Sequence, residues 1–303
     1  MTDRALLEDI SRSFPELELR SWRALGEGCM NRALLINETH VFRFAKNEDA
    51  AQDLEKEGAL LPLIAERTTL SVPCFGLVGR QSNGLTFVGY PIIAGDQLST
   101  ASFEALTPSE QQKLAVRLSQ LLEALQSVPS DACARAGLQP VDYESELAKD
   151  RLALRELHAR LQPTTRDYVE DRFDQFLARS SYFENTPRLI HADLSSDHLI
   201  FDNVRRELVG VIDFGDLELG DPDYEYLYLL EELGPAFAHR VMTLRGVSDP
   251  DATLEKVGYY LTFDHVQLMV GGLKRGLEAW IAEGIAGLEA EASNPKGWNR
   301  IAL

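Results

Sequence analysis

The chain has 303 residues, of which 45% are hydrophobic, and this length is enough to bury a substantial core and to form two unequal domains. Its 48 acidic and 30 basic side chains give a formal charge of −18. Such a charge repels phosphate backbones and attracts cations, so the composition disfavours a nucleic-acid partner and is compatible with a cationic ligand.

The cysteines and the first residues bear on where the protein works. Cys29, Cys74 and Cys133 are odd in number and lack C-x-x-C spacing, which favours a reducing cytoplasm. The start, MTDRALLEDI, is acidic where a signal peptide is basic and apolar, and no apolar run approaches the roughly 18 residues of a membrane span. We therefore expect a cytoplasmic protein with no membrane partner.

Strand signals come first along the chain. The runs RALLI and HVFRFA flank residues 37–39, which suit a hairpin loop. Apolar residues recur at helical spacing over 50–66, and two further strands are expected over 74–80 and 85–93, with a turn at 82–84. These patterns predict an antiparallel sheet with one helix.

Helical patterns dominate after Gly95. Residues 107–110, Thr-Pro-Ser-Glu, form a capping box with proline at the first helical position, and helical patterns return over 143–180 and 253–290. The sequence therefore predicts an α+β fold that divides into a strand-rich part, residues 1–95, and a mostly helical part, residues 96–303.

Two short segments of the helical part concentrate histidine and aspartate, HADLSSDH at 191–198 and IDFGD at 212–216. The residues between them suggest a small hairpin, so the polar side chains fall in loops at strand ends. Asp193 and Asp213 would then lie close enough to share a divalent cation. Carboxylates that converge without a paired lysine or arginine repel one another, so we expect a hard metal ion among them.

HADLSSDH resembles the catalytic loop of the aminoglycoside phosphotransferases and related small-molecule kinases, and IDFGD resembles their D-F-G-like metal motif. With DPDYEY at 221–226, the combination is far more specific than H-x-D alone. The resemblance is nearest to the 2''-phosphotransferase type and covers most of the chain. It implies a protein-kinase-like bilobal fold and transfer of the γ-phosphate of ATP or GTP to an aminoglycoside hydroxyl, which confers resistance.

The resemblance also implies roles for the two loops. Asp193 would be the catalytic aspartate that acts on the acceptor hydroxyl, and His191 would hold the loop by hydrogen bonds rather than react. His198 and Asp213 would ligate the Mg²⁺ that arrives with the nucleotide. His198 stands where most of the family has asparagine, and an imidazole suits a hard cation less well, although a branch of the 2''- and macrolide phosphotransferases shares this histidine.

The strand-rich part would bind the nucleotide. Gly26 and Gly28 lie between two predicted strands, where a kinase covers the phosphates with a glycine loop or where a plain hairpin turn forms. Arg43 takes the place of the usual phosphate-binding lysine, with Glu57 on the next helix as its acidic partner. Arg43 is preferred because it alternates with two phenylalanines and so points to one face; Lys46 is the alternative.

GYPIIAGDQL at 89–98 resembles the connection whose backbone groups bind the purine. Tyr90 would stand at its entrance and Ile93 would offer main-chain contacts. A bulky aromatic there could favour guanine, but it could equally be a tyrosine packed between the lobes, so ATP and GTP both stay open.

The acceptor would bind to acidic side chains and an aromatic ring in the helical part. A polyamine sugar needs carboxylates for its ammonium groups and a flat apolar face for its ring. By resemblance the acceptor site would contain Glu231, Glu232 and Trp280, and Asp197 and Asp216 would add negative charge to it. These residues favour an aminoglycoside over a macrolide, choline or an amino-alcohol.

Two other classes of protein stay open. Arg43 and His198, at positions that usually hold lysine and asparagine, would suit a catalytically impaired nucleotide-binding module. Alternatively, His191, Asp193 and His198 could ligate a transition metal in a phosphohydrolase. We expect the protein to be a monomer.

Overall fold

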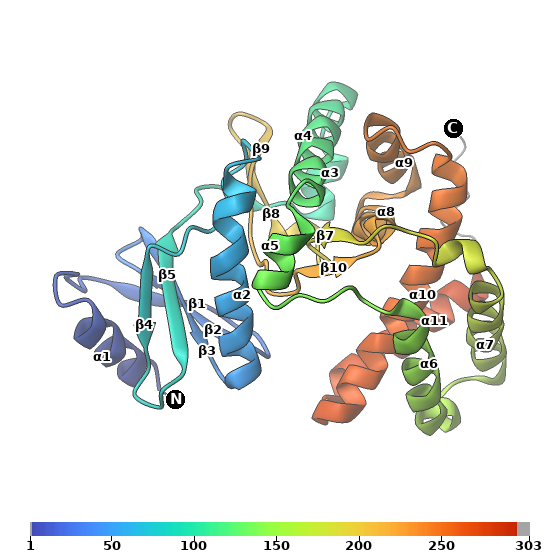
Figure 1. Ribbon diagram of the computed structural model, residues 1–303, viewed down its shortest axis with the longest axis horizontal. Coiled ribbons are helices and arrows are strands. Elements are labelled where there is room, and N and C mark those ends of the chain that lie inside the picture. Colours follow the sequence, from blue (N-terminus) through green and yellow to red (C-terminus); the bar gives the residue numbers. More distant parts are fainter. Residues whose placement is uncertain (1, 296–303) are drawn as a thin grey trace.

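The computed structural model describes residues 2–295. Its N-terminal part is a five-stranded antiparallel sheet in the order β1-β2-β3-β5-β4 (Figure 1). The strands are β1 (Trp22–Glu27), β2 (Asn31–Ile36), β3 (His40–Ala45), β4 (Leu77–Arg80) and β5 (Thr86–Pro91). The predicted hairpin and the later strand pair are therefore confirmed.

A helix covers each face of this sheet. Helix α2 (Glu48–Ala65), predicted over 50–66, packs Leu54 against Val88 of β5. Helix α1 (Asp3–Ser13) packs Leu6 and Ile10 against the other face. The sequence prediction of a single helix missed α1, although its apolar residues four positions apart carry the helical signal.

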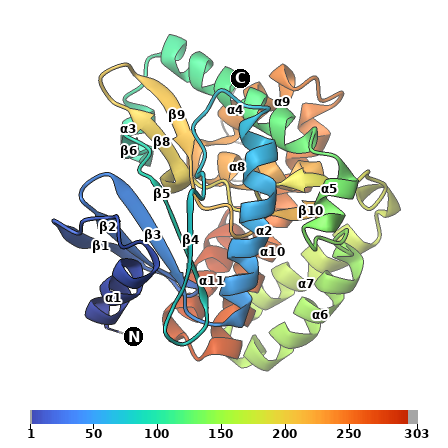
Figure 2. The same cartoon turned by 60° about the vertical axis from the view of Figure 1, so that its left-hand side comes forward.

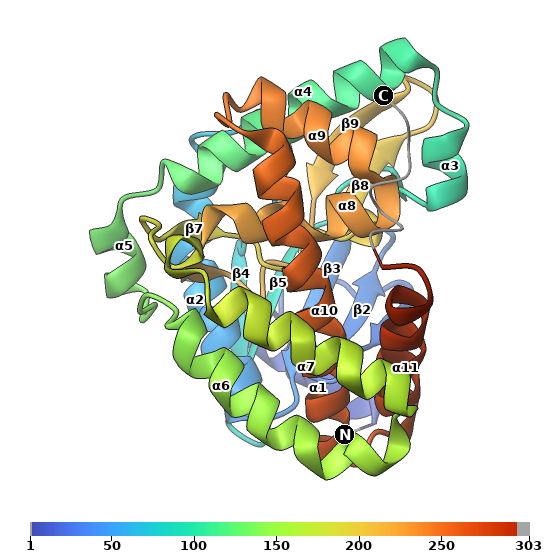
Figure 3. The same cartoon turned by 90° about the vertical axis from the view of Figure 1, so that its right-hand side faces the viewer.

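The C-terminal part is mostly helical, as predicted. Its α-helices are α3 (Thr100–Glu104), α4 (Pro108–Gln126), α5 (Ser130–Arg135), α6 (Tyr143–Leu154), α7 (Pro163–Leu177), α8 (Leu227–Leu233), α9 (Pro235–Leu244), α10 (Pro250–Arg275) and α11 (Glu278–Ser293). Short 3₁₀ helices are η1 (Arg155–Arg160), η2 (Ser180–Tyr182), η3 (Ser196–His198) and η4 (Pro222–Tyr226). Helix α10 runs through the middle of this part, flanked by α6 to α9 and α11 (Figure 3).

Local signals set several of these helix ends. Thr107 and Glu110 cap α4 reciprocally, as the capping box predicts. The helical stretch predicted over 143–180 is broken where Pro163 begins α7. The stretch predicted over 253–290 is broken at Gly276, whose φ of +67° lies in the left-handed region that ends helices. Within residues 2–295, none of the helices combines the length and apolar character needed to cross a bilayer.

Five short strands carry the loops that hold the histidines and aspartates. They are β6 (Asp96–Gln97), β7 (Arg188–Ile190), β8 (Leu199–Asp202), β9 (Glu207–Val211) and β10 (Glu218–Gly220). Strands β8 and β9 form the predicted hairpin, and β7 pairs with β10. The loop 191–198 follows β7, and the loop 212–217 joins β9 to β10, so both loops leave the same two small sheets.

The chain crosses from the N-terminal sheet to the C-terminal part over residues 92–95. Gly95 is required there, because a Cβ on it would lie 2.7 Å from the Ile200 side chain and 2.9 Å from the carbonyl oxygen of Phe201. Strand β6 then pairs directly with β8. The division after residue 95 predicted from the sequence falls in this crossing and stays a prediction.

Candidate active site

The two loops are tied together by hydrogen bonds. The Ile212 amide donates to the carbonyl of His198 at 3.0 Å, and Nε2 of His191 lies 3.1 Å from the carbonyl oxygen of Ile212. His191 is fully buried, and burial lowers its pKa to about 4, so the ring is neutral and donates this bond. His191 therefore joins the first loop to the second.

Glu225 fixes the backbone at the start of the first loop. The sequence analysis did not assign it a role. Its Oε1 accepts hydrogen bonds from the amides of His191 and Ala192, at 2.7 and 2.9 Å. It stands in the DPDYEY stretch, where Asp221 instead accepts from Lys256 and Tyr260. The DPDYEY motif was the signal available in the sequence, but nothing in it indicates that Glu225 is buried.

Two residues of these loops adopt left-handed backbone conformations. The φ values are +65° at Ala192 and +60° at Asp213. Such a conformation costs a residue with a Cβ about 1–2 kcal/mol, and it persists only where the surroundings enforce it. The backbone strain thus lies next to Asp193 in one loop and at Asp213 in the other. The sequence analysis assigned functional roles to both of these aspartates.

Asp193, His198 and Asp213 form one cluster. Nδ1 of His198 lies 3.5 Å from Oδ2 of Asp193, and its Nε2 lies 3.7 Å from Oδ2 of Asp213. Nδ1 also lies 2.8 Å from the carbonyl oxygen of Asp193. A carbonyl oxygen can only accept a hydrogen bond, so Nδ1 carries a proton. In the neutral ring, Nε2 then has a lone pair that points toward Asp213. Burial raises the pKa of Asp193 to about 6, against the lowering effect of His198.

The expectation that these carboxylates lack a paired cation is wrong. Nη2 of Arg43 lies 3.2 Å from Oδ1 of Asp213, so the N-terminal sheet supplies a cation to the D-F-G-like loop. The sequence could not reveal this pair, because the two residues are 170 positions apart. Lys56 of α2 adds a second link, since its Nζ donates to the carbonyl of Gly215 at 2.5 Å. Helix α2 stands between the sheet and these loops (Figures 1 and 2).

Arg43 and Glu57 form the expected pair. Nη1 of Arg43 donates to Oε2 of Glu57 at 2.7 Å, and both side chains are buried. Burial raises the pKa of Glu57 and the neighbouring guanidinium lowers it; we take the pair as ionised, because arginine keeps its proton in proteins. Arg43 points to the α2 face, whereas Phe42 and Phe44 pack on the α1 face.

Lys46 lies on the side of the sheet away from Asp213. It lines a hollow together with Leu6 and Phe44, and its Nζ donates to the carbonyl of Gly28 at 2.6 Å. The Gly28 amide in turn donates to the carbonyl of Asn31, as in a hairpin turn. A Cβ on Gly26 would meet no atom within 4 Å, so the space beside this turn is open.

The segment expected to contact the purine lies at the end of β5. Tyr90 is 6% exposed and its ring lies 5.6 Å from that of Phe75. Burial raises the pKa of Tyr90 to about 12, so its hydroxyl stays protonated. Ile93 packs on Gly210 of β9, where an added Cβ would lie 2.6 Å from it. The connection is therefore held by packing at both ends, at Tyr90 against Phe75 and at Ile93 against Gly210.

The acidic residues expected to bind the acceptor fall into two groups. Three of them, Asp197, Asp216 and Glu232, lie in the two loops or contact them, whereas Glu231 faces α10. Oδ1 of Asp197 accepts from the Ser195 hydroxyl at 2.6 Å, and burial raises the pKa of Asp216. Glu232 of α8 reaches the first loop, where it accepts from the Ser196 amide at 2.7 Å. Glu231 instead faces α10, with Oε1 3.6 Å from Nε2 of His265.

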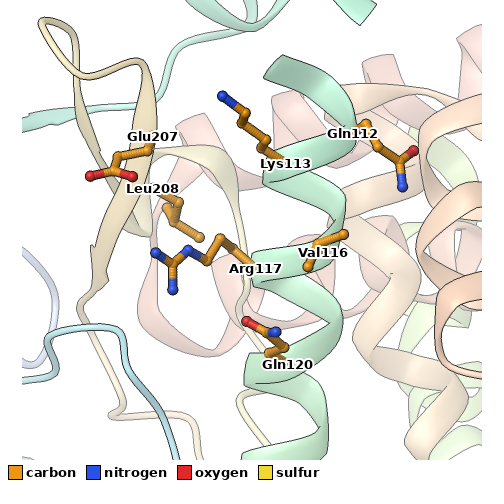
Figure 4. A pocket seen from close by; sticks show the side chains of 7 residues that line it. All are labelled: Gln112, Lys113, Val116, Arg117, Gln120, Glu207 and Leu208. Atoms are coloured by element: carbon orange, nitrogen blue, oxygen red, sulfur yellow. The ribbon is translucent and has the colours of Figure 1, made fainter. Parts of the chain in front are cut away.

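Trp280 lies in the first turn of α11, and the guanidinium of Arg275 lies 5.5 Å from its ring centroid. A separate hollow of about 370 Å³ lies between α4 and β9, lined by Lys113, Arg117, Val116 and Leu208 among others (Figure 4). Leu208 is near the start of β9 and Asp213 lies beyond its end, so this hollow is distinct from the aspartate cluster.

A divalent metal would find two protein groups in this cluster, the Asp213 carboxylate and Nε2 of His198. Residues 2–295 contain no group of three or more His, Cys, Asp or Glu side chains arranged to hold a metal ion by themselves. Mg²⁺ is usually bound by one or two carboxylates, with the remaining positions filled by water and substrate phosphates. The donor set therefore fits a Mg²⁺ that arrives with a nucleotide, and it does not fit a resident transition-metal centre.

The fold and the paired loops define a kinase-like phosphotransferase, and comparison with known proteins agrees. The sequence profile of the phosphotransferase enzyme family matches residues 21–255. A GDP complex of aminoglycoside 2'-phosphotransferase-IIIa is 34% identical, with a TM-score of 0.93 over 97% of this chain and 100% of that chain. A GDP and kanamycin complex of APH(2")-IIIa is 35% identical, with a TM-score of 0.91 over 95% and 98%.

The chain therefore belongs to the phosphotransferase enzyme family. The macrolide 2'-phosphotransferase MphH from Brachybacterium faecium is 18% identical, with a TM-score of 0.70 over 94% of this chain and 97% of that chain. That likeness concerns the fold alone, so the choice of acceptor depends on the site.

Proposed function

We propose that this protein transfers the γ-phosphate of ATP or GTP to a hydroxyl of an aminoglycoside and so confers resistance to it. The observation that carries the proposal is the likeness at 35% identity to an enzyme described with GDP and kanamycin, over 95% of this chain. The acidic side chains of the two loops and of α8, Asp197, Asp216, Glu231 and Glu232, would supply the charge that a polycationic sugar needs.

Asp193 acts on the acceptor. Its carboxylate is 30% exposed, while the backbone on both sides is fixed by Glu225 and by the His198 ring. A carboxylate held in this way can orient the acceptor hydroxyl and accept its proton as the phosphate is transferred. His191 stays neutral and buried, so it positions the loop and takes no proton.

Arg43 acts on the nucleotide. Glu57 orients the guanidinium by accepting from its Nη1, and Nη2 faces Asp213. Asp213 and His198 would hold the metal ion. The metal, when bound, would supply positive charge that offsets the charge of the nucleotide phosphates. The turn at Gly26 and Gly28 would cover the phosphates, and Tyr90 and Ile93 flank the connection where the purine would bind.

The test is an incubation of the purified protein with Mg²⁺, either nucleotide and one acceptor at a time, followed by mass detection of a phosphate on the acceptor. The expected result is a phosphorylated kanamycin or gentamicin and an unmodified macrolide. Phosphate found on the macrolide alone would assign the protein to the macrolide enzymes. Metal-dependent nucleotide binding without any phosphorylated acceptor would instead support an impaired module.

A further inference from the structure

A histidine joins two glutamates behind the expected acceptor site. His265 of α10 has Nδ1 2.7 Å from Oε1 of Glu291 on α11 and Nε2 3.6 Å from Oε1 of Glu231 on α8. The His265 side chain is 13% exposed and that of Glu231 is 35% exposed, so the row begins in the core and ends at the surface. Helices α8, α10 and α11 therefore meet at one imidazole.

The inner end of this row is fixed. Oε2 of Glu291 accepts from the hydroxyls of Thr262 and Tyr168, at 2.6 and 3.1 Å, while its Oε1 contacts His265. A Cβ on Gly287 would lie 2.3 Å from Nε2 of His265, so α11 presents a glycine where the ring packs. Hydrogen bonds on one side and close packing on the other leave the imidazole a single position.

The charge of the row is also defined. Burial by itself lowers the pKa of His265, but Glu231 and Glu291 raise it to about 10, so the ring is a cation at neutral pH. The other ionisable side chain next to it, Asp264, contacts the Tyr228 hydroxyl at 3.3 Å and has its pKa raised to about 6 by burial. The His265 cation, anchored by Glu291, can therefore hold the Glu231 carboxylate in position.

The adjacent glutamates of α8 have different tasks in this arrangement. Glu232 is engaged with the backbone of the first loop, through the Ser196 amide. Among the described residues, the ion pair with His265 is the one hydrogen bond or ion pair of the Glu231 carboxylate, and at 3.6 Å it is longer than a hydrogen bond. At least one of its carboxylate oxygens therefore stays available to a donor from outside.

We propose that His265 is a positioning residue for acceptor specificity: anchored by Glu291, it orients the Glu231 carboxylate toward an ammonium group of the acceptor. The inference rests on the proposed function and adds to it the residue that sets the direction of one acceptor contact. Without the cation, Glu231 would be a mobile surface glutamate, and holding it still on binding would cost conformational entropy. Acceptors without an ammonium group would gain nothing from it.

The test is a double-mutant cycle on the full chain, with kanamycin as the acceptor. We expect Glu231→Gln to raise the KM for kanamycin about tenfold and His265→Gln about fivefold, each with kcat nearly unchanged, because ground-state and transition-state binding are lost together. In the double variant the KM should stay about tenfold raised instead of reaching about fiftyfold, since His265 acts through Glu231. The KM for the nucleotide should not move.

His239→Gln is the matched control, because it makes the same change in α9, on a histidine whose ring nitrogens lie beside Thr243 and Asp251 instead. His265→Asn is a second variant if the glutamine does not fit, and thermal unfolding checks that each variant is folded. Multiplying effects, or an unchanged KM in His265→Gln, would overturn the positioning role. If the wild-type protein phosphorylates no aminoglycoside, the proposed function fails first and this inference fails with it.

Discussion

At the scale of single residues, supporting side chains hold the functional groups of the site in position. Glu57 holds Arg43 for Asp213, and Glu225 holds the backbone next to Asp193. The strained φ of Asp213, +60°, persists among such contacts. Removing a reacting group should therefore have an effect different from removing its support.

Asp193→Asn should abolish phosphate transfer and leave nucleotide binding nearly intact, because the carboxylate acts on the acceptor hydroxyl. Transfer is measured by mass detection of the phosphorylated acceptor, and nucleotide affinity by calorimetry in the presence of Mg²⁺. Turnover close to that of the wild type would remove Asp193 from the catalytic role.

Arg43→Met should lower the free energy of unfolding by about 3–5 kcal/mol, because it leaves the fully buried Glu57 without its cation. The double variant Arg43→Met, Glu57→Leu should recover most of that loss, since no buried charge then stays unpaired. Urea unfolding monitored by circular dichroism measures both. A double variant no more stable than the single one would contradict the buried ion pair as the cause.

At the scale of secondary-structure elements, α10 and α11 form a closely packed helix pair around His265. The helices approach closely because α11 carries glycines where α10 is nearest. A Cβ on Gly284 would lie 2.5 Å from the carbonyl oxygen of His265 and 2.5 Å from the Met269 side chain. The helix pair therefore fixes His265 in place through its backbone as well as its side chain.

Gly284→Ala should lower the free energy of unfolding by about 1–3 kcal/mol, because the nearest obstacle is backbone and cannot move aside. Gly271→Ala in α10 is the control: its nearest atom is the flexible end of Arg275 at 3.2 Å, so the higher helix propensity of alanine should leave stability equal or raised. Equal effects of the two substitutions in thermal unfolding would show that helix propensity, not close packing, decides.

The same helix pair predicts a dependence on pH. The pKa of His265 is raised to about 10 in the folded protein from an ordinary value of about 6.5. Its contribution to stability is therefore fully present below pH 6.5 or so and is lost as the pH rises through 10.

The comparison with His265→Gln measures that contribution. The difference in free energy of unfolding between the wild type and His265→Gln should shrink by at most about 5 kcal/mol from pH 6 to pH 10.5. Denaturant unfolding at a series of pH values gives this difference, and a difference that does not change with pH would mean that the imidazole is not a cation in the fold.

At the scale of the whole molecule, the charge of −18 would attract a cationic acceptor over long range, and salt would weaken that attraction. Charges in water are screened over about 8 Å at physiological ionic strength, so the KM for kanamycin should rise as salt is added. Glu231→Gln should reduce this salt dependence, whereas Glu16→Gln, an exposed glutamate of the N-terminal part, should leave it unchanged. Steady-state kinetics at several salt concentrations make the comparison, and identical slopes in both variants would locate the attraction elsewhere.

The sequence by itself determined what depends on neighbouring residues. Periodicity gave the sheet, α2 and the helical part, the capping box began α4, and the alternation around Arg43 directed it to the α2 face. The two motifs indicated kinase chemistry because their residues are spaced along short loops. The roles assigned to these residues, the monomeric state and the cytoplasmic setting stay predictions.

Only the tertiary structure decided which distant groups meet. Arg43 contacts Asp213 across 170 positions, and Glu225 reaches the His191 amide across 34. The same holds for His265, which no motif distinguished and which three helices bring between two glutamates. Periodicity and spacing report on contacts within an element, whereas the direction of a buried charge depends on packing between elements, and that packing has no local signature in the sequence.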